Sequence, residues 1–254
     1  MVGDFDADSD KVDLDVSSDI PDAVSVMPVV VSVIPAAIHR NLSDELYAKR
    51  KNGALDLEST TKCLTSAGDH DKISKIIEVL IEEFVKSPQA NHRKGGLIGL
   101  AAVTIGLSSD SARARQYLEQ IVPLVINSFS DEDSRVRYYA CEALYNIAKA
   151  VRGDLIVFFN QTFDALCKLS ADSDVEVQSA ACLLDRLVKD IVLESNQFSI
   201  EEFIPLFKER MNVLNPNVRE FLVGWFTVLD SAPDIDMLGF IPDFFDEYPR
   251  LDDQ

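Results

Sequence analysis

The feature that most constrains the fold is a helical segment that recurs along the chain. The segment at 130–149, SDEDSRVRYYACEALYNIAK, reappears 41 residues later at 171–190 as ADSDVEVQSAACLLDRLVKD, and a third copy begins near Asn215. Within each copy, apolar and small residues fall three and four positions apart, which is the spacing of one buried helix face. We therefore expect the chain to repeat one helical unit several times.

The repeat continues towards the N-terminus with a shift of about 43 residues. This shift places Lys94 opposite Arg137 and Lys51 opposite Lys94, so that five units of roughly 41–43 residues fit the chain. Helix pairs of this length are typical of HEAT repeats. Because no single unit can bury its own apolar face, neighbouring units must stack. The sequence predicts an all-α, HEAT/armadillo-like right-handed superhelical solenoid of antiparallel helix pairs.

We divide the chain into three parts on this basis. An acidic disordered tail covers 1–35, the HEAT-repeat solenoid of about five helix pairs covers 36–242, and a divergent acidic tail covers 243–254. Residues 1–22 carry eight Asp and one Lys, a composition too charged to bury a core. The string DFDADSD spaces its aspartates like the first ligands of a calcium loop, but the Gly and Glu that an EF-hand needs further on are missing.

The overall charge excludes one class of partner. The chain has 43 acidic and 24 basic residues, a formal net charge of −19. Binding to nucleic acid needs a basic surface, so we expect no nucleic-acid partner. The first 22 residues lack the basic start of a secretory signal, and the apolar run at 23–38 holds two prolines and is too short to span a membrane. Four scattered cysteines fit reduced thiols in the cytoplasm.

No arrangement of residues in the sequence indicates an enzyme. A nucleophile needs a base within reach, and the chain has three histidines, none at a zinc-type spacing from a Cys or another His. Neither a Walker motif nor a dinucleotide fingerprint is present. We therefore expect a non-catalytic protein without catalytic, cofactor-binding or metal-binding residues.

A recurring pair of charges has two interpretations. An Asp precedes the second helix of a unit, as Asp133 and Asp174 do, and a basic residue such as Arg137 or Arg219 follows at its start. The Asp is suited to cap the helix, and the basic residue to reach an Asp of the neighbouring unit in a ladder. The cations that this ladder leaves over are suited to a basic ridge for an acidic partner or a phosphoinositide surface. They are Lys49, Arg50, Arg93, Arg113, Arg115 and Arg135.

The tyrosines of RVRYYACEALYNI extend the candidate surface. Tyr138, Tyr139 and Tyr145 cannot all point inward on a helix that also buries Ala140 and Leu144. An exposed Tyr beside Arg is a common interface chemistry, whereas the alternative is that the rings pack between repeats. We predict a partner-binding surface that includes Arg93, Lys94, Arg135, Arg137, Tyr138 and Tyr139.

The stretch HRKGGLIGLAA (92–102) resembles a phosphate-binding loop at first sight. The repeat places it instead at the start of a unit's second helix. There, Gly95, Gly96 and Gly99 would each cost up to about 1 kcal/mol relative to Ala. We predict that these glycines allow a neighbouring helix backbone to approach closely, and that phosphate binding is the weaker alternative.

Several segments together resemble one family over about residues 32–245. They are ELYAKRKNGALDLE, HRKGGLIGLAA, SDEDSRVRYYACEALYNIAK, LLDRLVKDIVLES, FIPLFKERM and PDIDMLGFIPDF. The chain resembles the N-terminal part of the plant branch of the vacuole-morphology scaffold family, which organises the phosphatidylinositol-3-phosphate 5-kinase (PIKfyve-type) complex. The resemblance implies a non-catalytic scaffold that binds the kinase and controls PI(3,5)P2 synthesis.

The same resemblance carries expectations about location and other partners. It implies peripheral association, through partners, with the cytosolic face of endosomal and vacuolar membranes, or a cytoplasmic location. The family places phosphatase binding and self-association in later repeats that this sequence lacks, so the expectation does not extend to them. Two alternatives stay open: a generic HEAT-repeat adaptor for another partner, and a truncated paralogue with little function.

Overall fold

The computed structural model describes residues 33–232, 235 and 237–240. The tails expected at 1–35 and 243–254 therefore lie outside the described residues, apart from 33–35. The described residues all belong to one compact unit, Ser32–Gln254.

Within the described part of the chain, the structure contains ten α-helices and no β-strand. The helices are α1 (Ala36–Leu42), α2 (Tyr47–Ala67), α3 (His70–Val79), α4 (Ala90–Gly106), α5 (Ser111–Asn127), α6 (Ser134–Val151), α7 (Phe159–Leu169), α8 (Val175–Glu194), α9 (Ile200–Met211) and α10 (Pro216–Asp230). A π-helical segment, Leu80–Val85, prolongs α3, and 3-10 turns lie at Ser128–Ser130, Arg152–Phe158 and Met237–Phe240.

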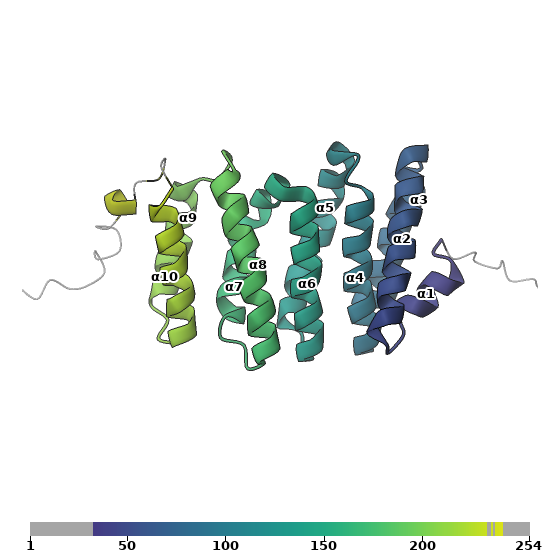
Figure 1. Ribbon diagram of the computed structural model, residues 1–254, viewed down its shortest axis with the longest axis horizontal. Coiled ribbons are helices and arrows are strands. Elements are labelled where there is room, and N and C mark those ends of the chain that lie inside the picture. Colours follow the sequence, from purple (N-terminus) through teal and green to yellow (C-terminus); the bar gives the residue numbers. More distant parts are fainter. Residues whose placement is uncertain (1–32, 233–234, 236, 241–254) are drawn as a thin grey trace, which may run out of the picture. The chain divides into compact units, whose positions relative to one another are not determined.

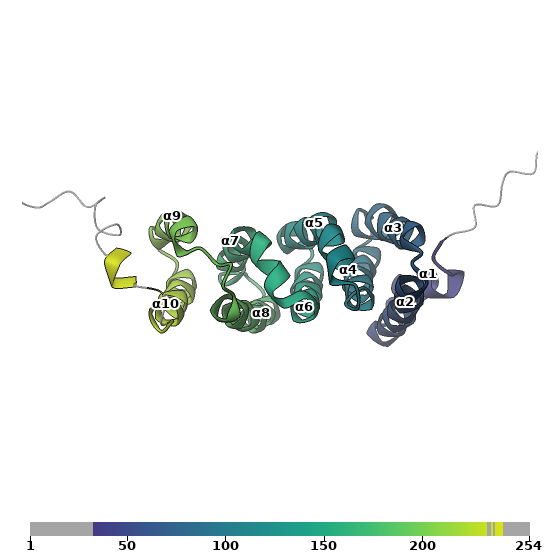
Figure 2. The ribbon, with the colours of Figure 1, turned by 90° about the horizontal axis from the view of Figure 1, so that it is seen from above.

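The helices form two rows (Figures 1 and 2). Helices α2, α4, α6, α8 and α10 make one row, which we call the even row, and α3, α5, α7 and α9 make the odd row. Within the even row, α2 packs on α4, α4 on α6, and α6 on α8. Each odd-row helix is followed by its even-row partner, and α1 packs on α2 and α4. The predicted all-α, HEAT-type solenoid of helix pairs is confirmed.

Short polar side chains explain where three of the even-row helices, α6, α8 and α10, begin. Asp133 accepts hydrogen bonds from the backbone N–H groups of Arg135 and Val136, and Asp174 accepts from that of Glu176. Asn215 caps α10 in the same way. These side chains satisfy backbone donors that have no partner inside the helix. The capping role predicted for Asp133 and Asp174 is confirmed.

The core lies between the two rows. On α6, the predicted inward face is buried: Val136, Ala140, Ala143, Leu144 and Ile147 are at most 1% exposed. Towards the C-terminal end, an aromatic cluster takes over, in which Phe163 packs edge-to-face against Phe203 and Trp225. Each unit thus buries its apolar face against the next, as stacking requires.

The glycines of HRKGGLIGLAA lie inside α4 at a close helix contact. A Cβ on Gly95 would overlap the carbonyl oxygen of Leu42, at the end of α1. A Cβ on Gly96 would come within 2.8 Å of the Cβ of Phe84 and 2.9 Å of the backbone nitrogen of Val85. The prediction of close approach by a neighbouring backbone is confirmed for Gly95 and Gly96, whereas a Cβ on Gly99 would meet the side chain of Leu80 at 2.8 Å.

Candidate functional site

The exposed face of the even row carries several large apolar side chains. Leu55 on α2 is 50% exposed, and Val175 and Leu183 on α8 are 70% and 58% exposed. Between them, Tyr138 and Tyr145 of α6 are half-buried. A cluster of exposed apolar side chains on one face of a soluble protein is typical of a binding surface. We call this face the even-row face.

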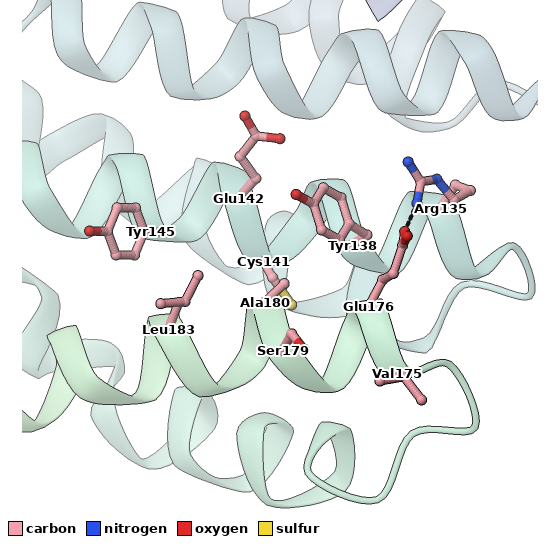
Figure 3. Close-up of a pocket in the computed structure, with 10 residues that line it drawn as sticks. All are labelled: Arg135, Tyr138, Cys141, Glu142, Tyr145, Val175, Glu176, Ser179, Ala180 and Leu183. Carbon is pink, nitrogen blue, oxygen red and sulfur yellow. Dashed lines mark hydrogen bonds and ion pairs between the residues drawn. The ribbon is translucent and has the colours of Figure 1, made fainter.

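A hollow of about 510 Å³ lies between α6 and α8 on this face (Figure 3). Arg135 and Glu176 close one end with an ion pair between the two helices. Tyr145 and Leu183 stand towards the other end. The hollow is lined by Arg135, Tyr138, Cys141, Glu142, Tyr145, Val175, Glu176, Ser179, Ala180 and Leu183. We call it the α6/α8 hollow.

A second hollow, of about 310 Å³, lies over α4 between α2 and α6. It exists because α4 presents the small side chains of Ala101 and Ala102 where its neighbours present larger ones, such as Tyr47 and Glu142. We call it the α4 hollow. Glu142 lines both hollows, so the two are adjacent along the even-row face.

Glu142 is a recessed carboxylate at the junction of the hollows. It projects from α6 on the side away from α8 (Figure 3), and its Oε1 accepts a hydrogen bond of 3.3 Å from the Tyr47 hydroxyl. Burial raises the pKa of the Glu142 carboxyl, against the lowering effects of this hydrogen bond and of nearby Lys51. Tyr47 and Glu142 thus join α2 to α6 across α4.

Two of the predicted site residues, Arg93 and Arg137, belong to a ladder inside the solenoid. Arg137 donates from Nε and Nη2 to the two carboxylate oxygens of Asp172, at 2.7 and 2.8 Å. Arg93 does the same with Asp131, at 2.7 and 2.9 Å. Burial alone would raise the pKa of Asp172, but hydrogen bonds from Arg137 and the Asp174 backbone hold it below its usual value. The predicted ladder is confirmed for Arg137, but its partner is Asp172 rather than a capping Asp. Arg93, predicted to lie outside the ladder, belongs to it, whereas Arg219 donates to the Val213 carbonyl.

The repeat register predicted from the sequence is wrong by one residue in the first units. Arg93 donates to the Ser87 carbonyl and Arg137 to the Asp131 carbonyl, each six residues earlier. Arg50 donates likewise to the Asp44 carbonyl. Arg50 and Arg93, rather than Lys51 and Lys94, therefore occupy the Arg137 position. Two adjacent basic residues stand at each place, and the lengths of the preceding turns differ, so the sequence does not reveal which one fits.

Tyr139 is buried within the array, whereas Tyr138 lies on its surface. Tyr139 is 5% exposed, and its hydroxyl accepts a hydrogen bond of 2.8 Å from Arg50, whose guanidinium also lies 5.1 Å from the ring centroid. Tyr138 lines the α6/α8 hollow, with the Arg135 guanidinium 5.2 Å from its ring centroid. One predicted tyrosine therefore packs between units, and the other faces outward.

Lys94 is the predicted cation that has no partner among the described residues. It is half-buried, and it sits one turn before Ile98, which lines the α4 hollow. Burial lowers the pKa of the Lys94 ammonium, and the positive charges of Arg50 and Arg135 lower it further, against the effect of Asp133. Because the Lys94 ammonium is partly removed from water and lies near other positive charges, an anion that binds beside it would stabilise its charged form.

The remaining cations of the predicted basic ridge are mostly engaged. Lys49 pairs with Asp44 and Arg115 with Asp154, while Arg50 is 3% exposed. Arg93 and Arg135 pair with Asp131 and Glu176. These cations therefore do not form a continuous basic ridge, because most of them pair with acidic residues or are buried. Lys94, by contrast, has no partner among the described residues.

Metal, membrane and thiol chemistry add no further site to the described residues. Among them, no group of His, Cys, Asp and Glu is placed to hold a metal ion. No described helix is both long and apolar enough to cross a bilayer. The four cysteines are free, and burial raises the pKa of the Cys141 thiol to about 12, which leaves it unreactive at neutral pH.

The residues predicted from the sequence do not include Tyr47, Glu142 and Leu183. A signal existed for Leu183, because it falls outside the inward face that Val177, Ala181 and Leu184 define. Exposed apolar residues are common one at a time, however, and only the structure shows that these side chains meet.

Fold and face together define the class of protein: a helical-repeat solenoid with an exposed apolar and aromatic face, of the kind used to bind other proteins. Residues 91–190, which run from α4 to α8, match the family described as the vacuolar 14 Fab1-binding region. The chain belongs to the VAC14 family, as the resemblance predicted.

Individual relatives agree with this assignment. The chain is 80% identical over 220 residues to the protein VAC14 homolog of Arabidopsis thaliana, covering 87% of this chain and 29% of that protein. It is 40% identical to the vacuole morphology and inheritance protein 14 of Saccharomyces cerevisiae, covering 82% and 28%. The chain thus spans less than a third of these relatives. The MAST/Orbit N-terminal domain shares the fold, with a TM-score of 0.50, 16% identity, and coverage of 84% and 89%.

Proposed function

We propose that this chain is a non-catalytic scaffold segment that binds a Fab1-type phosphatidylinositol-3-phosphate 5-kinase and so supports PI(3,5)P2 synthesis. The main support for the proposal is that the family match and the hollows fall on the same helices. The region matched by the Fab1-binding family, residues 91–190, contains α4, α6 and α8, and it is here that the even-row face has its hollows. A rigid solenoid presenting such a face is suited to holding a partner in a fixed orientation.

Within this proposal, the predicted site residues separate into two groups. Arg135 and Tyr138 line the α6/α8 hollow, and Lys94 lies one helical turn before Ile98 of the α4 hollow, so these three are proposed contacts. Arg93, Arg137 and Tyr139 are held inside the solenoid by hydrogen bonds, so we assign them to the rigidity of the surface rather than to the contact itself.

Location follows from the partner in this proposal. The kinase would bring the chain to the cytosolic face of endosomal and vacuolar membranes, as a peripheral protein. The mostly paired cations of the described helices favour attachment through partners over direct binding to anionic lipid.

Co-elution on a sizing column tests the function. The purified full chain is mixed with the purified kinase, and a shared earlier peak is expected. The absence of a shared peak from a chain with a sharp, helical melting transition would overturn kinase binding and favour a generic adaptor, whose partner a pull-down from cell extract would identify. Weak helicity with a broad transition would favour the other alternative, a truncated paralogue with little function.

A further inference from the structure

The even-row face has a shape that suits an extended segment lying across the helices. The α4 hollow and the α6/α8 hollow are neighbours, since Glu142 lines both. Packed helices stand roughly 8–10 Å apart, so a hollow over α4 and one between α6 and α8 are about 12–15 Å apart. An extended chain covers this distance in about four residues.

Lining chemistry indicates which side chains fit the hollows. The floor of the α4 hollow is made by Ala101 and Ala102, and Leu55 stands at its wall. The α6/α8 hollow is walled by Tyr138, Tyr145 and Leu183. Either hollow would remove a bulky apolar side chain from water, and burial of apolar surface stabilises a complex.

Charge indicates the sign of the segment. Arg135 and Glu176 neutralise each other across the α6/α8 hollow, and the Glu142 carboxylate is engaged by Tyr47. Lys51 lines the α4 hollow, and Lys94 lies one turn from it; neither forms a hydrogen bond or ion pair with a described residue. On a chain with net charge −19, this face therefore offers unpaired positive charge beside apolar hollows, which complements an acidic segment.

We propose that the even-row face binds an extended acidic segment of the kinase, which places one bulky apolar side chain in each hollow and a carboxylate at Lys94. The inference rests on the proposed function and adds to it the chemistry of the bound segment. The two apolar residues of that segment lie about four positions apart, with Asp or Glu close to the one in the α4 hollow.

Affinity measurements on the full chain test the proposal, with the purified kinase as the probe. Leu183→Glu and Lys94→Glu alter the even-row face, while Val157→Glu and Lys75→Glu place the same changes at exposed positions of the 3-10 turn Arg152–Phe158 and of α3. We expect Kd to rise about tenfold or more in the first two variants and to stay within about twofold in the controls. Lys94→Gln should weaken binding less and reduce its dependence on salt.

Four outcomes would overturn the proposal, and they differ in whether the proposed function is retained. Equal affinity of all variants for a kinase that binds the wild-type chain would remove this surface but keep the proposed function. Lack of binding by the wild-type chain would remove both. Tighter binding by Lys94→Glu, with loss of binding in Glu142→Lys, would assign the face to a basic segment. Sedimentation showing that Leu183→Glu separates a dimer, with kinase affinity unchanged, would assign it to a second copy of the chain.

Discussion

The guanidinium of Arg137 donates hydrogen bonds to both carboxylate oxygens of Asp172, which belongs to the next unit of the solenoid. The side chains of this pair are 14% and 8% exposed. One unit earlier, Arg93 and Asp131 repeat the arrangement. Since the same Arg137 also donates to the Asp131 carbonyl, successive rungs are connected. The ladder fixes how each unit is rotated against its neighbour, and therefore how the even-row helices line up.

Removal of one rung should destabilise the solenoid. Arg137→Ala leaves the Asp172 carboxylate buried without its partner, and loss of one member of a buried pair costs about 2–4 kcal/mol. We expect urea unfolding, followed by circular dichroism, to show this loss in the free energy of unfolding. Arg115→Ala is the matched control, because Arg115 is 65% exposed in its pair with Asp154 and such a pair is worth under about 1 kcal/mol. Equal losses in the two variants would contradict a special role for the ladder.

The same pair predicts how stability depends on pH. The pKa of Asp172 is lower in the folded chain than in the unfolded one, so the unfolded chain binds its proton more readily as pH falls. The stabilisation is thus present above the unfolded pKa, near 4, and is lost as pH falls through the folded pKa. Asp172→Asn should reduce stability at pH 7, and its difference from wild type should shrink below about pH 4. Asp56→Asn, at an exposed position, should show no such convergence.

Gly95→Ala should destabilise the chain although alanine is the better helix former. The added methyl group overlaps the Leu42 carbonyl, which belongs to backbone and cannot rotate away. Overpacking of this kind costs about 1–3 kcal/mol, more than the gain of up to about 1 kcal/mol in helix propensity. Gly153→Ala, where nothing lies within 4 Å of the new methyl group, should leave the melting temperature unchanged or raise it. A Gly95→Ala chain that melts above wild type would contradict the close contact.

The contrast between Arg137 and Lys94 shows what the sequence reveals of this fold. Period, caps and the inward face of α6 follow from spacing alone, because each depends on neighbours within one helix. The one-residue error at Lys94 arose because Arg93 and Lys94 are both basic, and only the turn before α4 decides which of them reaches Asp131.

The site was harder to predict than the fold. Arg93, Arg137 and Tyr139 have the residue types of an interface, yet they contact Asp131, Asp172 and Arg50 inside the array. The α6/α8 hollow depends on side chains from two helices and the α4 hollow on side chains from three, and these helices belong to different units of the repeat. A single sequence does not show which outward side chains of different units meet, so it does not predict Glu142 and Leu183 as site residues.

We predict that Asp185 on α8 also stabilises the fold, and the fluorescence of the chain's one tryptophan can be used to measure its contribution. Asp185 is 7% exposed. It accepts hydrogen bonds of 2.8 Å from the Trp225 indole and 2.6 Å from Lys189. Asp185→Ala leaves an indole N–H unpaired and a lysine without its counter-ion, so we expect a loss of about 2–4 kcal/mol in urea unfolding followed by Trp225 fluorescence.

The conservative variant separates the hydrogen bond from the charge. Burial raises the pKa of Asp185, against the effect of Lys189, so the ionised form is disfavoured in the fold. Asp185→Asn retains an acceptor for Trp225 without that charge and should therefore lose less stability than Asp185→Ala. Asp190→Ala, at an exposed position of the same helix, controls for helix propensity. Both variants gain the same helix propensity, and only Asp185→Ala removes the acceptor of the Trp225 hydrogen bond. Unfolding of the two variants at the same urea concentration would therefore show that this bond contributes nothing to stability.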